Sequence, residues 1–169
     1  MAQAKIVGKE NVFDFSIGNP SVPAPEKVAE VVRELLEMDP IALHGYTPAS
    51  GCYEAKEAIA ADLSKRARDK IRPENIFFTC GAAPAMTACM HALAVENAEF
   101  LLIAPYFSEY PAYCTSTGAK CVVVPPDTER FQIRFDELEK RITQNTQAVI
   151  INSPNNPSGI LFSGSACRS

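Results

Sequence analysis

From residue 76 onward, short β-prone runs alternate with helical segments, and this alternation constrains the fold more than any other feature. Four runs are almost continuously apolar or β-branched: 76–79 (IFFT), 100–104 (FLLIA), 121–124 (CVVV) and 148–152 (AVIIN). Helices are predicted between them, at 83–95, 108–117 and 135–143. Continuous apolar runs are typical of strands buried on both faces, and helical connections join parallel neighbours. The sequence therefore predicts an α/β fold, with a mostly parallel sheet and flanking helices.

Two further helices are predicted before the alternation begins. Residues 25–38 carry valines and leucines at helical spacing, Pro25 suits the first helical position, and Asp39-Pro40 ends the run. Residues 52–69 are rich in Ala, Glu and Lys and predict a second helix. A loop rich in Gly and Pro lies between them, so we place a boundary there: an N-terminal segment, 1–42, and an α/β domain, 43–169.

Composition excludes several classes of function. The net charge is −4 and the basic residues are scattered, which argues against nucleic acid as the main partner. No stretch is long and apolar enough to span a membrane and the first residues lack an apolar leader, so we expect a cytoplasmic protein. The six cysteines include no CxxC pair and no zinc spacing, so neither a disulfide framework nor a metal site is predicted.

The residues that follow each strand are the candidates for function, because ligands of such sheets bind beyond the carboxyl ends of the strands. The run 76–79 leads into Gly81, Ala82 and Ala83 at the start of a helix. Exposed N–H groups and the helix dipole suit a phosphate there. Taken alone, a close strand-to-helix packing turn explains this segment better. It is neither a Walker loop nor a GxGxxG dinucleotide fingerprint.

Two other strand ends are unusual. Tyr106, Phe107 and Tyr110 crowd the end of the run 100–104, where they could stack on a flat heteroaromatic ligand or simply fill the core. The last run ends in NSPNNPSG (152–159), in which amide side chains alternate with X-Pro bonds that can adopt the cis form. This string is more elaborate than a turn requires and is the most specific motif in the chain.

Five blocks together resemble the class I/II, fold type I aminotransferases that depend on pyridoxal phosphate (PLP), in family order and at family-like spacing. They are SIGNP (16–20), GYTPASG (45–51), TCGAAPAM (79–86), APYFSEY (104–110) and NSPNNPSG (152–159). The resemblance covers nearly the whole chain. It implies an incomplete large domain of the PLP-transferase fold type I, preceded by a segment of the small domain.

The resemblance also implies roles for particular residues. Gly81, Ala82 and Ala83 would hold the cofactor phosphate, Phe107 would stack on the pyridine ring, and Asn156 would bind the phenolic oxygen. In a homodimer, Tyr46 would reach the phosphate bound by the partner subunit. Gly18 would lie where the substrate carboxylate approaches. The substrates would be an amino acid and a 2-oxo acid.

The family places its Schiff-base lysine downstream of the asparagine block, together with an aspartate for the pyridine nitrogen, a tyrosine and a carboxylate-binding arginine. The lysines of this chain all lie at or before Lys140, on segments where the family has no such residue. We therefore expect an N-terminal portion without a catalytic lysine, inactive by itself. Two alternatives remain at this point: a PLP-dependent carbon-sulfur lyase of the same fold, and a non-catalytic binding or assembly module.

Overall fold

The computed structural model describes residues 2–12, 18 and 22–163, which form two compact units, Met1–Ala49 and Ser50–Ser169. The division falls within the loop rich in Gly and Pro. Most of the block SIGNP, together with Cys167 and the rest of 164–169, lies outside the described residues. The assignment of 1–42 to a small domain stays a prediction.

The first unit contains short helices: α1 (Ala2–Val7), the 3-10 turn η1 (Lys9–Asn11), α2 (Glu26–Leu36) and α3 (Pro40–His44). Helix α2 confirms the amphipathic helix predicted at 25–38, although it ends earlier and Pro25 stands just before its first residue instead of within it, and none of its residues is buried. Asp39 and Pro40 do more than end it. The Asp39 carboxylate accepts a hydrogen bond of 3.0 Å from the Ala42 N–H, and so caps α3, which the sequence did not predict.

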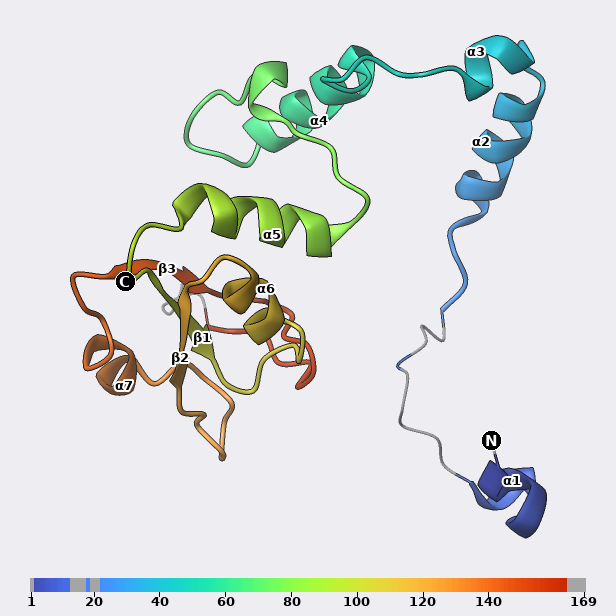
Figure 1. The fold of residues 1–169 in the computed structure, drawn as a ribbon. Helices are drawn as coiled ribbons and strands as arrows, with labels where there is room; N and C mark the ends of the chain where they lie inside the picture. Colours follow the sequence, from blue (N-terminus) through green and yellow to red (C-terminus); the bar gives the residue numbers. More distant parts are fainter. Residues whose placement is uncertain (1, 13–17, 19–21, 164–169) are drawn as a thin grey trace. The chain divides into compact units, whose positions relative to one another are not determined.

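The second unit is built on a parallel sheet with the strand order β2-β1-β3 (Figure 1). Its strands are β1 (Glu99–Ile103), β2 (Lys120–Val124) and β3 (Thr146–Ile150). Its helical elements are α4 (Tyr53–Ser64), the turn η2 (Pro73–Asn75), α5 (Ala82–Leu93), α6 (Tyr110–Ser116) and α7 (Phe135–Glu139). The parallel sheet, three of the predicted strands and the helices between them are thereby confirmed.

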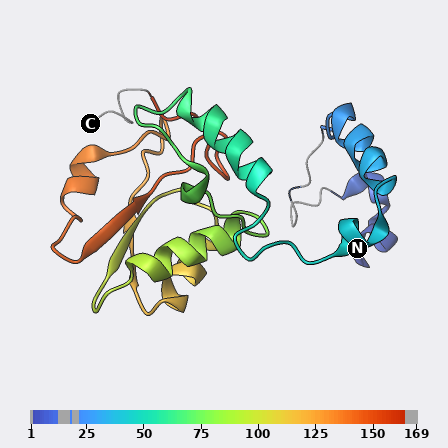
Figure 2. The ribbon, with the colours of Figure 1, turned by 90° about the horizontal axis from the view of Figure 1, so that it is seen from above.

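The central strand β1 is buried along its whole length because helices cover both faces of the sheet. On one face, Phe100 and Leu102 pack with Met90 of α5 and Cys114 of α6. These two helices lie side by side (Figure 2). On the other face, Leu101 and its neighbours pack with Ile133 and with Leu138 of α7. The outer strands β2 and β3 are only partly buried, which explains why their sequences are less uniformly apolar.

One predicted strand is wrong: residues 76–79 form no strand in the described structure. The segment has no regular secondary structure and pairs with none of the three strands of the sheet. Phe77 and Phe78 are 83% and 47% exposed. A β-prone run needs a hydrogen-bonded neighbour to become a strand, and no described segment supplies one here. Within the described residues, no helix is long and apolar enough to cross a membrane.

Candidate functional site

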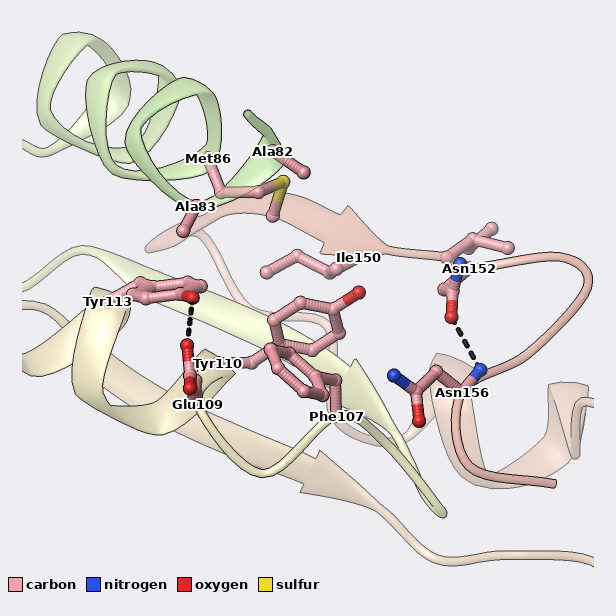
Figure 3. Close-up of a pocket in the computed structure, with 11 residues that line it drawn as sticks. Ala82, Ala83, Met86, Phe107, Glu109, Tyr110, Tyr113, Ile150, Asn152 and Asn156 are labelled. Carbon is pink, nitrogen blue, oxygen red and sulfur yellow. Dashed lines mark hydrogen bonds between the residues drawn. The ribbon is translucent and has the colours of Figure 1, made fainter. Parts of the chain in front are cut away.

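A cavity of about 550 Å³ lies where the chain leaves β1 and β3 and enters α5. Figure 3 shows the start of α5 on one side, the rings of Phe107 and Tyr110 opposite, and Asn152 and Asn156 at one end. The lining residues are Ala82, Ala83, Met86, Phe107, Glu109, Tyr110, Tyr113, Ile150, Ile151, Asn152 and Asn156. They come from three segments that are far apart in the sequence. The fold therefore builds this cavity where parallel sheets place their ligands.

The start of α5 presents main-chain N–H groups to this cavity. Gly81 is the residue before the helix, with φ 100° and ψ −175°, and no side chain caps the first turn. Such a conformation is accessible essentially to glycine alone. The Thr79 hydroxyl donates a 2.7 Å hydrogen bond to the Gly81 carbonyl, which fixes the turn. Because Ala82 and Ala83 are small and line the cavity, an anion can approach the helix terminus closely.

The aromatic residues form a connected group on the opposite wall. The rings of Phe107 and Tyr110 meet edge to face, with centroids 5.7 Å apart and an interplanar angle of 77°. The Tyr113 ring is 6.3 Å from that of Tyr110. The Tyr113 hydroxyl donates a hydrogen bond to the Glu109 carboxylate, and this bond raises the pKa of Tyr113. The wall thus offers a flat apolar surface with one acidic group beside it.

Asparagine side chains organise the loop after β3. Asn155 is 7% exposed, and its Oδ1 accepts hydrogen bonds from the Ser158 N–H and hydroxyl, at 3.2 and 2.7 Å. The Asn156 N–H donates to Asn152 Oδ1 at 2.6 Å (Figure 3). The bonds Ser153-Pro154 and Asn156-Pro157 are cis. This network leaves the Asn156 side chain on the cavity wall.

The structure brings together four of the predicted cofactor residues: Ala82, Ala83, Phe107 and Asn156. Gly81 shapes the turn but does not line the cavity. Tyr46 and Gly18 belong to the other compact unit, and both are exposed. Their roles stay predictions.

Sequence reasoning missed several residues of the wall, including Met86, Glu109 and Tyr113. Glu109 lies within the aromatic block and Tyr113 follows it by four residues, and this helical spacing could have indicated that they face the same way. Met86 lies one turn after Ala82 on α5, so it shares its face. Asn152 opens the motif 152–159 that the sequence singled out, whereas the sequence gives no comparable sign that Ile150 lines the cavity.

The chemistry that these residues permit is the binding of a flat, anionic aromatic molecule. Its anionic group would meet N–H donors at α5, its ring would meet Phe107, and a polar ring substituent would meet Asn156. No lysine, arginine or histidine is among the lining residues in the described part of the chain. Residues 2–12, 18 and 22–163 contain no group of three or more potential metal ligands.

Comparison with known proteins reveals extensive similarity. The family model "Aminotransferase class I and II" matches residues 10–167. An aspartate aminotransferase of Thermotoga maritima is 32% identical over 162 residues, which are 95% of this chain and 42% of that protein. A probable aspartate/prephenate aminotransferase of Aquifex aeolicus is 32% identical over 154 residues, 90% of this chain and 38% of the relative.

A solved structure gives the same result in three dimensions. The crystal structure of an aminotransferase from Eubacterium rectale superposes with a TM-score of 0.90 and 50% identity. The superposition covers 98% of this chain and 42% of the other. The chain thus spans well under half the length of the relatives it matches.

Proposed function

The chain belongs to the class I and II aminotransferase family, and from this membership we propose that its cavity binds pyridoxal phosphate. Members of the family generally use this cofactor. The observation that carries the proposal is the meeting of three groups on one cavity: Ala82 and Ala83 at the start of α5, the Phe107 ring, and the Asn156 amide. Cavities that bind small ligands enclose about 300–1,000 Å³, and this one falls within that range.

Each part of the cofactor has a chemically suitable partner. The N–H groups at the start of α5 would bind the phosphate, because they are donors at the positive end of a helix of 12 residues. Phe107 would pack against the pyridine ring, and the Asn156 amide would donate to the phenolic oxygen. When bound, the cofactor acts as an electron sink for the bonds around the amino-acid α-carbon.

The proposal extends to the whole protein. It would transfer an amino group between an amino acid and a 2-oxo acid, as a cytoplasmic homodimer. The Tyr46 side chain is fully exposed, which suits a residue that serves the site of the partner subunit. Gly18 has open space where a side chain would stand, so its backbone is accessible to a substrate carboxylate. Residues 1–42 would belong to the small domain.

This chain should bind the cofactor without catalysing amino transfer. No described lysine lines the cavity, so no amine is positioned to exchange with substrate at the cofactor. We therefore expect weak cofactor binding without amino transfer above that of free PLP.

The test is a binding titration by equilibrium dialysis with PLP and with pyridoxal, which lacks the phosphate. PLP should bind more tightly than pyridoxal because only the phosphate engages α5. Replacement Phe107→Leu should weaken PLP binding by about two- to tenfold, the range expected for one aromatic contact. The matched control is Phe135→Leu, on a ring of α7 outside the cavity.

The same samples are assayed for transamination with several amino acids and 2-oxoglutarate. They are also reduced with borohydride and searched for labelled lysine by mass spectrometry. Equal affinity for PLP and pyridoxal, or no effect of Phe107→Leu, would contradict the cofactor site. Turnover that disappears when one labelled lysine is replaced would contradict the expected lack of catalysis.

A further inference from the structure

Lys56 is a buried cation outside the proposed cofactor site. It lies in the first turns of α4, and only 6% of its surface is exposed. Its stem passes close to Gly51, where an added Cβ would lie 3.5 Å from Lys56 Cε and 2.7 Å from the Phe78 ring. Gly51 has φ +86°, so both its backbone and its lack of a side chain favour glycine. The glycine thus leaves room for the Lys56 side chain, although lysines are rarely buried in proteins.

The Lys56 ammonium has no hydrogen-bond acceptor within the described residues. The one interaction described for this ammonium is a cation–π contact with the Phe77 ring, whose centroid is 5.6 Å from Nζ. A cation–π contact does not occupy the three N–H donors of an ammonium. Because no described buried nitrogen is both sealed from solvent and unbonded, Nζ must keep an opening to its surroundings.

A cavity of about 420 Å³ provides this opening. It is lined by Ser50, Tyr53, Lys56, Pro73, Glu74 and Phe77. The cavity therefore has one cation, one carboxylate and an apolar surface from a ring and a proline. Lys56 and Glu74 form no ion pair, so the opposite charges are more than 4.0 Å apart. The cation and the carboxylate therefore both line the cavity without contacting each other.

We propose that this cavity binds a small α-amino acid in its zwitterionic form. The carboxylate of the ligand would accept hydrogen bonds from the Lys56 ammonium, and its ammonium would donate to Glu74. An apolar side chain would pack against Phe77 and Pro73. Charge-assisted hydrogen bonds are the strong ones, and a partly desolvated ammonium gains most from an anionic acceptor. The site is separate from the cavity of Phe107 and Asn156.

The test uses the whole chain without PLP and L-leucine as the probe, with binding measured by calorimetry. Isocaproate, which is leucine without its ammonium, and isoamylamine, which is leucine without its carboxylate, are the matched ligands. Leucine should bind saturably, and each matched ligand should bind about tenfold or more weakly, as expected for the loss of one charge-assisted bond.

Variants assign the binding to this cavity. Lys56→Met and Glu74→Gln should each weaken leucine binding by a similar factor, whereas Lys56→Arg should retain much of it. Lys65→Met removes an exposed lysine near the end of the same helix and should have no effect. Phe107→Leu should have none either, which separates this site from the proposed cofactor site. If Lys56→Met does not fold, Glu74→Gln still tests the proposal, because Glu74 is exposed and its replacement should not disturb folding.

Three results would overturn the proposal. The first is the absence of saturable leucine binding. The second is isocaproate binding as tight as that of leucine, because Glu74 would then have no part. The third is leucine binding that Lys65→Met weakens as much as Lys56→Met does.

Discussion

The Asn155 side chain donates a hydrogen bond of 3.2 Å to the main-chain carbonyl of Pro105, and so joins the loop after β3 to the loop after β1. Pro105 precedes Phe107 by two residues, and Asn155 precedes Asn156 by one. The bond therefore links the two loops that carry the ring and the amide proposed to hold the cofactor. Its donor is buried, and the same amide accepts two bonds from Ser158 within its own loop.

We expect Asn155→Ala to lower the free energy of unfolding by about 1–3 kcal/mol, because it removes the hydrogen bonds of a buried side chain and leaves the partly buried Pro105 carbonyl without its donor. PLP affinity should fall as well, since Asn156 loses its position. Urea denaturation and cofactor titration measure the two effects. Gln144→Ala removes an exposed amide for which no hydrogen bond is described, and serves as the control. Unchanged stability in Asn155→Ala would contradict a structural role for this bond.

A second prediction concerns the turn before α5. We expect Gly81→Ala to cost about 1–3 kcal/mol, the usual penalty for a side chain held in a region of φ and ψ open mainly to glycine. Steric conflict is not the cause, because an added Cβ at Gly81 meets nothing within 4 Å. Gly18→Ala is the control, because an added Cβ at Gly18 also meets nothing within 4 Å and Gly18 has no left-handed φ. Equal urea midpoints for the two variants would show that the Gly81 turn relaxes without cost.

The alternation of strands and helices could be read from the sequence because burial leaves a direct mark on it. The run 100–104 becomes β1, whose residues are all buried, and its continuous apolar character predicted a central strand. The family resemblance added the identity of the fold, and the structural relatives confirm the α/β fold type I class. Residues of three of the blocks line one cavity, among them Ala82, Phe107 and Asn156, and their cofactor roles stay predictions.

The errors concern properties that depend on neighbours. The run 76–79 has the composition of a strand, but pairing requires a second segment, and none is described beside it. The role of Asn155 was not visible because its acceptor, Pro105, is distant in the sequence. The side chains of Glu109 and Tyr113 were overlooked because the pattern indicated an aromatic cluster rather than the acid–phenol pair that forms at the start of α6.

Cysteine reactivity gives a third prediction. Cys114 is fully buried between α6 and the sheet, and its burial, helped by the neighbouring Cys121 thiol, raises its pKa to about 11. The thiolate is the reactive form, so Cys114 should resist alkylation in the native protein. The exposed Cys80 and Cys89 should react first with iodoacetamide at mildly alkaline pH. Mass spectrometry over time measures this order, and urea should abolish the difference. Equally fast labelling of Cys114 and Cys89 in the native state would contradict the buried position.

The last prediction concerns stability in acid. Glu137 of α7 accepts hydrogen bonds from Lys140 at 2.8 Å and Arg141 at 2.5 Å, and these bonds lower its pKa from 4.5 to about 2. A carboxylate whose pKa is lower in the folded state stabilises the protein above its unfolded pKa. This contribution is lost as the pH falls from about 4.5 toward 2.

We therefore expect Glu137→Gln to lower the urea midpoint at neutral pH. The difference in midpoint between variant and wild type should shrink as the pH falls from about 4.5 toward 2. Because α7 covers one face of the sheet, the loss should be seen in the unfolding of the whole second unit. Glu139→Gln, on the same helix at an exposed position for which no ion pair is described, is the control and should keep a constant small difference. A gap for Glu137→Gln that is equally large at neutral pH and near pH 2 would show that the neutral amide disrupts packing rather than removing a charge.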